Sequence, residues 1–176
     1  MTDTAQAVRD RLAMAPWWVK VLVIFVASRI VTTIILLVFA QLQQQNAWTG
    51  AHPDYFSFAG IWDGNWYRIV GVSGYPSALP VSADGHVAQN AWAFLPAYPY
   101  LVAAITAVTG SSALANPAAF YAVGSIVSVL FTAGSALMFY RLLVRQLGSS
   151  TALFSVALFC FAPLSPIFQE IGRAHV

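Results

Sequence analysis

The chain has 176 residues, of which 59% are hydrophobic and only 8% are charged. A soluble domain carries roughly a quarter charged residues to cover its surface, so this composition excludes an ordinary soluble domain and indicates lipid-facing surface. The net charge of +2 and the lack of a Lys/Arg-rich run argue against a nucleic-acid partner, and the single cysteine excludes an internal disulfide.

Three segments are apolar over the roughly 20 residues that a helix needs to cross a bilayer. They are Trp17–Ala40, Pro117–Tyr140 and Thr151–Phe168. The first is too long for the core of a signal peptide, and two tryptophans at its start are typical interfacial anchors. The second carries a row of small residues that suits close helix packing, namely Gly124, Ser128, Gly134 and Ser135.

A fourth uncharged stretch, Ala91–Thr109, is predicted to lie at the membrane surface rather than to cross. Pro96 and Pro99 interrupt it and leave only about ten residues, or roughly 15 Å of helix, from position 100 onward. The charges point the same way. Basic residues precede the first span, and Arg141 and Arg145 follow the second. Loops rich in Lys and Arg usually lie on the cytoplasmic side of the membrane. Both of these flanks can be cytoplasmic only if Ala91–Thr109 does not cross.

The predicted architecture is an all-α, multi-pass membrane bundle, with the bacterial plasma membrane as the expected location. Residues 1–16 form a cytoplasmic N-terminus, and residues 141–150 form a cytoplasmic loop. Residues 41–116 form a long extracytoplasmic loop with interfacial helices near 64–73 and 91–109.

The last six residues, 171–176, are expected to be a sequencing or cloning artefact. Together with Glu170 they can be reverse-translated into the start of a common sequencing adapter, and no loop follows the third span. A natural short C-terminus is the alternative. We therefore expect the chain to be the N-terminal fragment of a longer protein, inactive on its own.

Two acids lie in the aromatic-rich part of the external loop, Asp54 and Asp63. Asp63 is a good N-cap, and the helix after it is predicted to end at about Ser73, with Gly74 as its breaker. Its apolar stripe is predicted to face the membrane, and it consists of Trp66, Ile69, Val70 and Ser73.

Two roles for Asp63 stay open. It is either only a helix cap beside an interfacial belt of aromatic residues, or a carboxylate flanked by aromatic faces that bind sugar rings. The two are compatible, because a capping carboxylate stays ionised and remains able to act as a base.

Other polar residues give weaker signals. His52 and His86 lie near Asp54 and Asp84 without the spacing of a metal site, so solvated loop residues are favoured and no metal ligand is predicted. Arg29 falls about halfway along the first span, where a charge is costly. Either it pairs with an acid on a helix beyond this chain, or it contacts a lipid phosphate.

Several motifs follow one another along the chain. They are Ser28-Arg29, Trp62-Asp63-x-x-Trp66-Tyr67 with Gly74-Tyr75, Phe94-Leu95-Pro96-x-Tyr98-Pro99, and Phe161-Ala162-Pro163-x-Ser165-Pro166-x-Phe168. Together they resemble the N-terminal part of the PIG-V-type mannosyltransferases, a family of GT-C membrane glycosyltransferases. In that family the last motif leads into Tyr-Ser-Glu-Ser, which Glu170 and the tail replace here.

The resemblance implies a GT-C helical bundle that moves a sugar, expected to be mannose, from a polyprenyl-phosphate donor to an extracytoplasmic hydroxyl of a glycolipid or glycan. It implies Asp63 as the catalytic acid/base residue. Arg68 and Arg29 are the candidates for holding the leaving phosphate. The remaining residues expected to bind substrate are Trp62, Asn65, Trp66 and Tyr67.

A non-enzymatic membrane protein, such as a transporter or a lipid-binding subunit, is the alternative. Transporters tend to place polar residues at the bilayer midplane on broken helices. Here, apart from Arg29, the polar residues lie in the external loop, which favours the enzyme.

Overall fold

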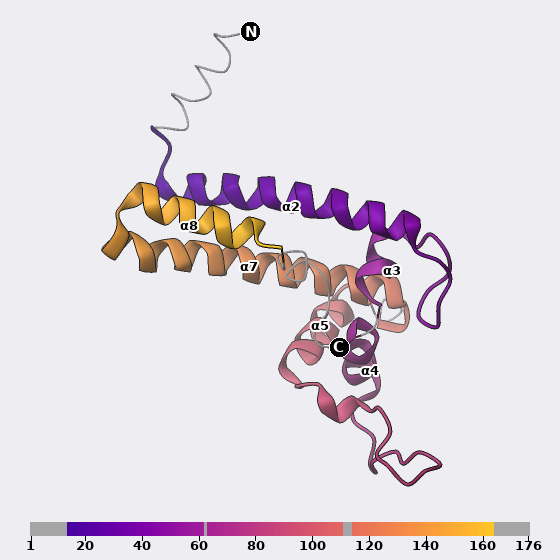
Figure 1. Ribbon diagram of the computed structural model, residues 1–176. Coiled ribbons are helices and arrows are strands. Elements are labelled where there is room, and N and C mark those ends of the chain that lie inside the picture. The colour runs from indigo at the N-terminus through magenta and orange to yellow at the C-terminus, as the bar shows by residue number, and fades with distance from the viewer. Residues whose placement is uncertain (1–13, 62, 111–113, 164–176) are drawn as a thin grey trace.

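The computed structural model describes residues 14–61, 63–110 and 114–163. Three long helices lie side by side as an elongated bundle (Figure 1): α2 (Trp17–Leu42), α7 (Pro117–Leu147) and α8 (Ser149–Phe161). Shorter helices gather at one end of the bundle: α3 (Tyr55–Ala59), α4 (Asp63–Ser73), the 3-10 helix η1 (Ala91–Ala93) and α5 (Ala97–Val108). Among the described residues, an isolated bridge between Val81 and Val87 is the one β feature.

Two of the described helices, α2 and α7, are long and apolar enough to cross a membrane. They have 26 and 31 residues, which exceeds the length needed for a hydrocarbon core about 30 Å thick. A core helix of a soluble protein would be mostly buried, whereas only 33% of the apolar window in α2 and 22% in α7 is buried. Large apolar side chains such as Ile34 and Leu130 point outward. These exposed apolar faces favour membrane association.

Helix α7 is longer than the sequence predicts. It begins as expected, with Pro117 at its first position and the Asn116 side chain accepting a hydrogen bond from the Ala118 amide. Residues 141–147, expected in a loop, instead form its last two turns. The loop conformation predicted for residues 141–150 is therefore wrong, because arginine is a good helix former and the chain turns only at Gly148. The cytoplasmic location of this segment stays a prediction.

Gly148 alone joins α7 to α8. Its φ of 75° with ψ of 167° is a conformation that essentially only glycine adopts. The described part of α8 has 13 residues, or about 20 Å of helix, which is shorter than a full span. The predicted continuation to residue 168 and the suspected tail at 171–176 lie outside the described residues.

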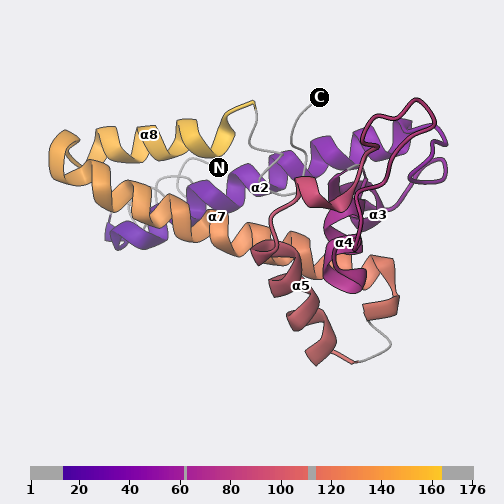
Figure 2. The same ribbon diagram turned by 90° about the horizontal axis from the view of Figure 1, so that it is seen from below.

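The core of the long bundle lies between α2, α7 and α8. It consists of Val21, Phe25, Ala136, Tyr140, Ala152, Val156 and Cys160. Trp17 stacks on Tyr140 with ring centroids 5.4 Å apart, which joins the first turn of α2 to α7. Figure 1 shows the three helices along one another, and Figure 2, seen from below, shows α2 and α7 crossing obliquely while α5 projects away from them.

Helix α5 lies within the predicted range 91–109, and its prolines do not interrupt it, so it starts at Ala97 and not at position 100. Pro96 lies at its N-cap and Pro99 in its first turn, where the missing amide proton breaks no helical hydrogen bond. Its 12 residues give about 18 Å of helix, still well short of a bilayer core. Val102 and Ala103 pack against Phe120 and Tyr121 of α7, so α5 is held against the start of that helix.

Candidate functional site

Helix α4 carries most of the residues that the sequence singles out. Asp63 is the first residue of the helix rather than its N-cap, and Trp62, which precedes it, lies outside the described residues. A carboxylate in the first turn is still stabilised by the partial positive charge of the helix N-terminus. The predicted end is confirmed, because α4 stops at Ser73 and Gly74 has a φ of 75°.

A glycine lets α4 approach its neighbours closely. A Cβ atom at Gly71 would lie 2.8 Å from the carbonyl oxygen of Pro99 and 2.9 Å from the ring of Phe120. Val70, next to it, is completely buried. The helix is therefore wedged between the first turn of α5 and the start of α7, which fixes the position of its polar side chains.

Tyr67 lies one turn beyond Asp63 on the same face of α4. Burial raises the pKa of the Tyr67 phenol above its ordinary value, and the nearby carboxylate of Asp63 raises it further. The phenol therefore stays protonated and able to donate a hydrogen bond at neutral pH. Its ring packs edge-on against Phe94 and Tyr98, with centroids 5.2 and 5.4 Å away.

The structure brings together two motifs that are separated in the sequence. Trp66 and Tyr67, from the Trp-Asp motif, both contact Phe94 of the Pro-x-Tyr-Pro motif. Tyr98 in turn donates a hydrogen bond to the carbonyl oxygen of Gly124 at 2.9 Å, and its hydroxyl lies 2.7 Å from Ser128 Oγ. Aromatic packing and these hydrogen bonds connect α4, α5 and α7 into one unit.

Half of the predicted small-residue row on α7 serves this contact. Gly124 is buried, and its carbonyl oxygen accepts the proton of the Tyr98 hydroxyl, while Ser128 Oγ lies 2.7 Å from the same hydroxyl. Gly134 has open space where a Cβ atom would be, and Ser135 is exposed. Within the described ranges, the second half of the row therefore packs against no other helix.

Arg68 and Asn65 share a tyrosine that the sequence does not reveal. The hydroxyl of Tyr121 donates a hydrogen bond to Asn65 Oδ1 at 3.4 Å, and the guanidinium of Arg68 lies close to the same hydroxyl. Arg68 Nε is buried without a hydrogen-bond partner among the described residues. No local signal marks Tyr121, because it belongs to an apolar helix 56 residues from Asn65.

Arg29 is held by a different part of the bundle. Its Nη2 donates to the carbonyl oxygen of Cys160 at 3.0 Å, and its Nε donates to Ser28 Oγ at 3.3 Å. The guanidinium also lies over the ring of Phe25, 5.3 Å from the centroid. These contacts place a buried cation against the C-terminal end of α8, where helix carbonyls favour positive charge. Both sequence-based alternatives for Arg29 stay predictions.

Asp54 is a structural cap, a role that the sequence analysis did not assign. One carboxylate oxygen accepts hydrogen bonds from the amides of Phe56 and Ser57 at 2.9 and 3.1 Å, and the other accepts the Ser57 hydroxyl at 2.6 Å. The hydroxyl contributes most to holding the pKa of Asp54 below its ordinary value. An acid three residues before a serine at the start of a short helix is the signal that could have shown it.

The two histidines of the loop make local contacts. His52 has a positive φ of 50°, and its Nδ1 lies 2.5 Å from the Gln41 carbonyl oxygen. The carbonyl oxygen of His86 accepts the Ser82 hydroxyl in a turn that also involves Asp84. Among the described residues, no group of three His, Cys, Asp or Glu side chains lies close enough to hold a metal ion.

The apolar stripe of α4 faces another part of the chain. Trp66, Ile69 and Ser73 line a hollow of about 320 Å³ together with residues of the segment 74–91. That segment is tied down where the Trp92 indole donates to the Pro76 carbonyl oxygen at 3.1 Å. Ser73 stays exposed, and Trp66 and Ile69 are only partly buried, so the loop covers part of the stripe. The membrane-facing orientation of the stripe stays a prediction.

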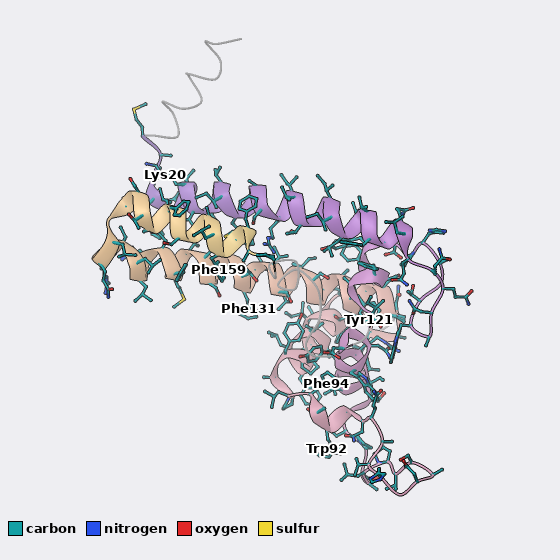
Figure 3. The ribbon with its side chains drawn as sticks, in the orientation of Figure 1. Lys20, Trp92, Phe94, Tyr121, Phe131 and Phe159 are labelled. Atoms are coloured by element: carbon teal, nitrogen blue, oxygen red, sulfur yellow. The ribbon has the colours of Figure 1, made fainter. Side chains whose placement is uncertain are left out.

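Figure 3 shows Tyr121, Phe94 and Trp92 following one another down this end of the molecule. Helix α4 lies there with a carboxylate, an amide and a guanidinium on two consecutive turns.

No family model, no curated protein and no solved structure matches the chain.

Proposed function

We propose that the chain is part of a multi-pass GT-C-type membrane glycosyltransferase that uses a polyprenyl-phosphate sugar donor. The observation that carries the proposal is the polar cluster on α4. Asp63, Tyr67 and Arg68 lie within two turns of one helix, beside the start of the candidate span α7. A lipid-linked substrate has an apolar tail in the bilayer and reacting atoms in water. A protein that acts on it therefore needs an apolar helical bundle with polar groups at the end of that bundle.

Asp63 has the properties of the base in this reaction. Its carboxylate removes the proton from the acceptor hydroxyl while the hydroxyl oxygen forms a bond to the anomeric carbon of the sugar. The bond between that carbon and the phosphate oxygen of the donor breaks, and its electron pair leaves with the polyprenyl phosphate. The same negative charge stabilises the positive character that develops on the sugar in the transition state.

Arg68 is the matching group for the leaving phosphate. A buried polar atom without a partner costs about 1–3 kcal/mol, and more when it carries charge. The buried Nε of Arg68 is such an atom among the described residues. The Arg68 side chain as a whole is only half-buried, so its remaining N–H groups can donate charge-assisted hydrogen bonds to a phosphate oxygen.

The aromatic side chains and the amide account for sugar binding. The Tyr67 phenol stays protonated beside Asp63 and can donate to a sugar hydroxyl, with mannose as the expected sugar. Asn65 holds the Tyr121 hydroxyl and retains an amide group for the substrate. Trp66 offers an aromatic face, although Phe94 covers part of it.

The expected orientation places this cluster outside the cell. The start of α2 and the end of α7 lie at the opposite end of the bundle from α4 (Figure 1). These two helix ends carry the basic residues Lys20, Arg141 and Arg145. Cytoplasmic flanks are enriched in Lys and Arg, so that end is assigned to the cytoplasm and α4 to the extracytoplasmic surface of the bacterial plasma membrane.

Replacing Asp63 by asparagine tests the proposal. We expect transfer of labelled sugar from a polyprenyl-phosphate donor to fall by roughly 10²–10⁴-fold in membranes from cells that express the complete gene. Asparagine keeps the shape of the side chain and is well tolerated at helix N-termini, so expression and thermal stability should stay near wild type.

Asp54→Asn is the matched control. It makes the same change at the other acid in the aromatic-rich part of the loop, where the carboxylate caps α3. Transfer by this variant should stay near wild type. Normal transfer by Asp63→Asn with loss in Asp54→Asn would reassign the base to Asp54. Normal transfer by both variants would contradict a catalytic role for either acid. Equal transfer in membranes from cells that lack the gene would contradict the enzyme and favour the non-enzymatic alternative.

A further inference from the structure

A second hollow lies at the opposite end of the molecule from α4. It is a cleft of about 800 Å³ among α2, α7 and α8. Leu137, Phe139 and Phe159 line its apolar body, and the last two rings pack with centroids 5.5 Å apart. Arg141 and Arg145 also line it, and both are exposed near the end of α7, which forms its rim. The cleft therefore has an apolar interior and a cationic rim.

The two arginines are positioned to act together. They are four residues apart on α7 and so lie on one face of the helix, roughly 6 Å from each other at the Cβ atoms. The Arg141 guanidinium is held 5.2 Å from the centroid of the Trp17 ring, which orients it at the margin of the cleft. Arginine pairs of this kind bind phosphate oxygens through several directed hydrogen bonds.

The charge at this end is positive among the described residues. Lys20, near the start of α2, lies far from Tyr121 in Figure 3 and at the end of the bundle where α7 ends. Arg141 and Arg145 belong to that end of α7. The described acids are Asp54, Asp63 and Asp84, all in the segment between α2 and α5. A negatively charged occupant is therefore attracted to the rim and meets no described carboxylate there.

The position of the cleft along the bundle indicates which kind of anion it binds. Trp17 is the first residue of α2, so the rim lies where a membrane-crossing bundle meets the lipid headgroups, and the apolar body lies toward the hydrocarbon. A free phosphate would fill only the rim. A phospholipid fills both parts, with its phosphate at the arginines and the first carbons of an acyl chain in the body.

We infer that this cleft is a binding site for an anionic phospholipid of the adjacent membrane leaflet, of the phosphatidylglycerol type. The inference requires that α2 and α7 cross a membrane, and it is independent of the transfer reaction. A lipid held there fastens α2, α7 and α8 to one another at their charged end and fixes the depth of the bundle in the bilayer.

Native mass spectrometry of the purified full chain with phosphatidylglycerol or phosphatidylcholine tests the inference. We expect binding of phosphatidylglycerol to be favoured by roughly tenfold or more. Arg145→Gln should remove most of that preference. It is a cleaner variant than Arg141→Gln, because Arg141 also contacts Trp17. Lys20→Gln is the matched control, since it removes one positive charge at the same end without lining the cleft.

Three outcomes would overturn the inference. Equal binding of both lipids would mean that the cleft does not recognise charge. Equal loss in Arg145→Gln and Lys20→Gln would reduce the effect to general surface attraction. Displacement of the lipid by an equal concentration of inorganic phosphate would show an anion site at the rim alone. Thermal unfolding of each variant without lipid separates a lost site from a lost fold.

Discussion

Gly71 sets how closely α4 can lie against its neighbours. The atoms that a Cβ would meet are a backbone carbonyl oxygen of Pro99 and the ring of Phe120, which is completely buried. Neither can move away without displacing α5 or α7, so the position of the polar cluster depends on a missing methyl group. Gly60 plays the same part for α3, since a Cβ there would lie 2.5 Å from the Tyr121 ring.

Gly71→Ala is therefore expected to lower the free energy of unfolding by about 1–3 kcal/mol through overpacking. Gly134→Ala is the control, because it also adds a methyl group inside a helix but meets nothing within 4 Å. That variant should be neutral or stabilised by up to about 1 kcal/mol through helix propensity. Thermal unfolding of both proteins in detergent measures the difference. Equal stabilities would mean that α4 does not pack this closely.

The polar residues of the loop were recognisable from their types, but their partners were not. Asp63 and Arg68 stand out as charges among aromatics in a hydrophobic chain, and the structure places both on α4. The contacts of Arg29 with Cys160 and of Asn65 with Tyr121 join residues 131 and 56 positions apart. Such long-range pairs depend on how the helices pack, which no local pattern in a single sequence encodes.

At the scale of the helices, one tyrosine fastens α5 to α7. The Tyr98 hydroxyl interacts with both the Gly124 carbonyl oxygen and Ser128 Oγ, while its ring packs on Tyr67. Because α4 packs on α5, this contact also supports the polar cluster.

Tyr98→Phe should lower the free energy of unfolding by about 1 kcal/mol, because the ring stays and only the hydrogen bonds are lost. Combining it with Ser128→Ala in a double-mutant cycle should give a coupling energy of about 0.5–1.5 kcal/mol. Tyr100→Phe on the same helix is the control, since Tyr100 is exposed and should show little effect. A coupling energy near zero would rule out the contact.

The starts of the long helices could be predicted better than their ends. Trp17 and Pro117 begin α2 and α7 as expected, because a proline and the edge of an apolar run mark both sites. The end of α7 was placed too early, because Arg141 and Arg145 suggested a loop. The true signal was Gly148, whose positive φ stops the helix.

At the scale of the whole molecule, the number of crossings before α8 decides which side each loop occupies. Helix α5, at about 18 Å, is too short to cross, so the chain should cross once in α2 and once in α7. The loop that contains residue 83 and the turn after Gly148 should then lie on opposite sides.

Single cysteines at these two places test the topology. In a Cys160→Ala background, Ala83→Cys should react with an impermeant thiol reagent applied to intact cells, and Ser150→Cys should react only after the membrane is opened. Both positions are exposed in the structure, so burial does not confound the result. Labelling of both cysteines in intact cells would mean that α5 does cross the membrane.

The single glycine between α7 and α8 also bears on how the protein is made. A longer linker would let a ribosome-bound chain release α7 into the lipid before α8 is synthesised. With Gly148 as the only residue between them, the two helices can reach their antiparallel arrangement only as a pair. We therefore expect α7 and α8 to form as one hairpin, and its turn offers almost no extended chain to a protease.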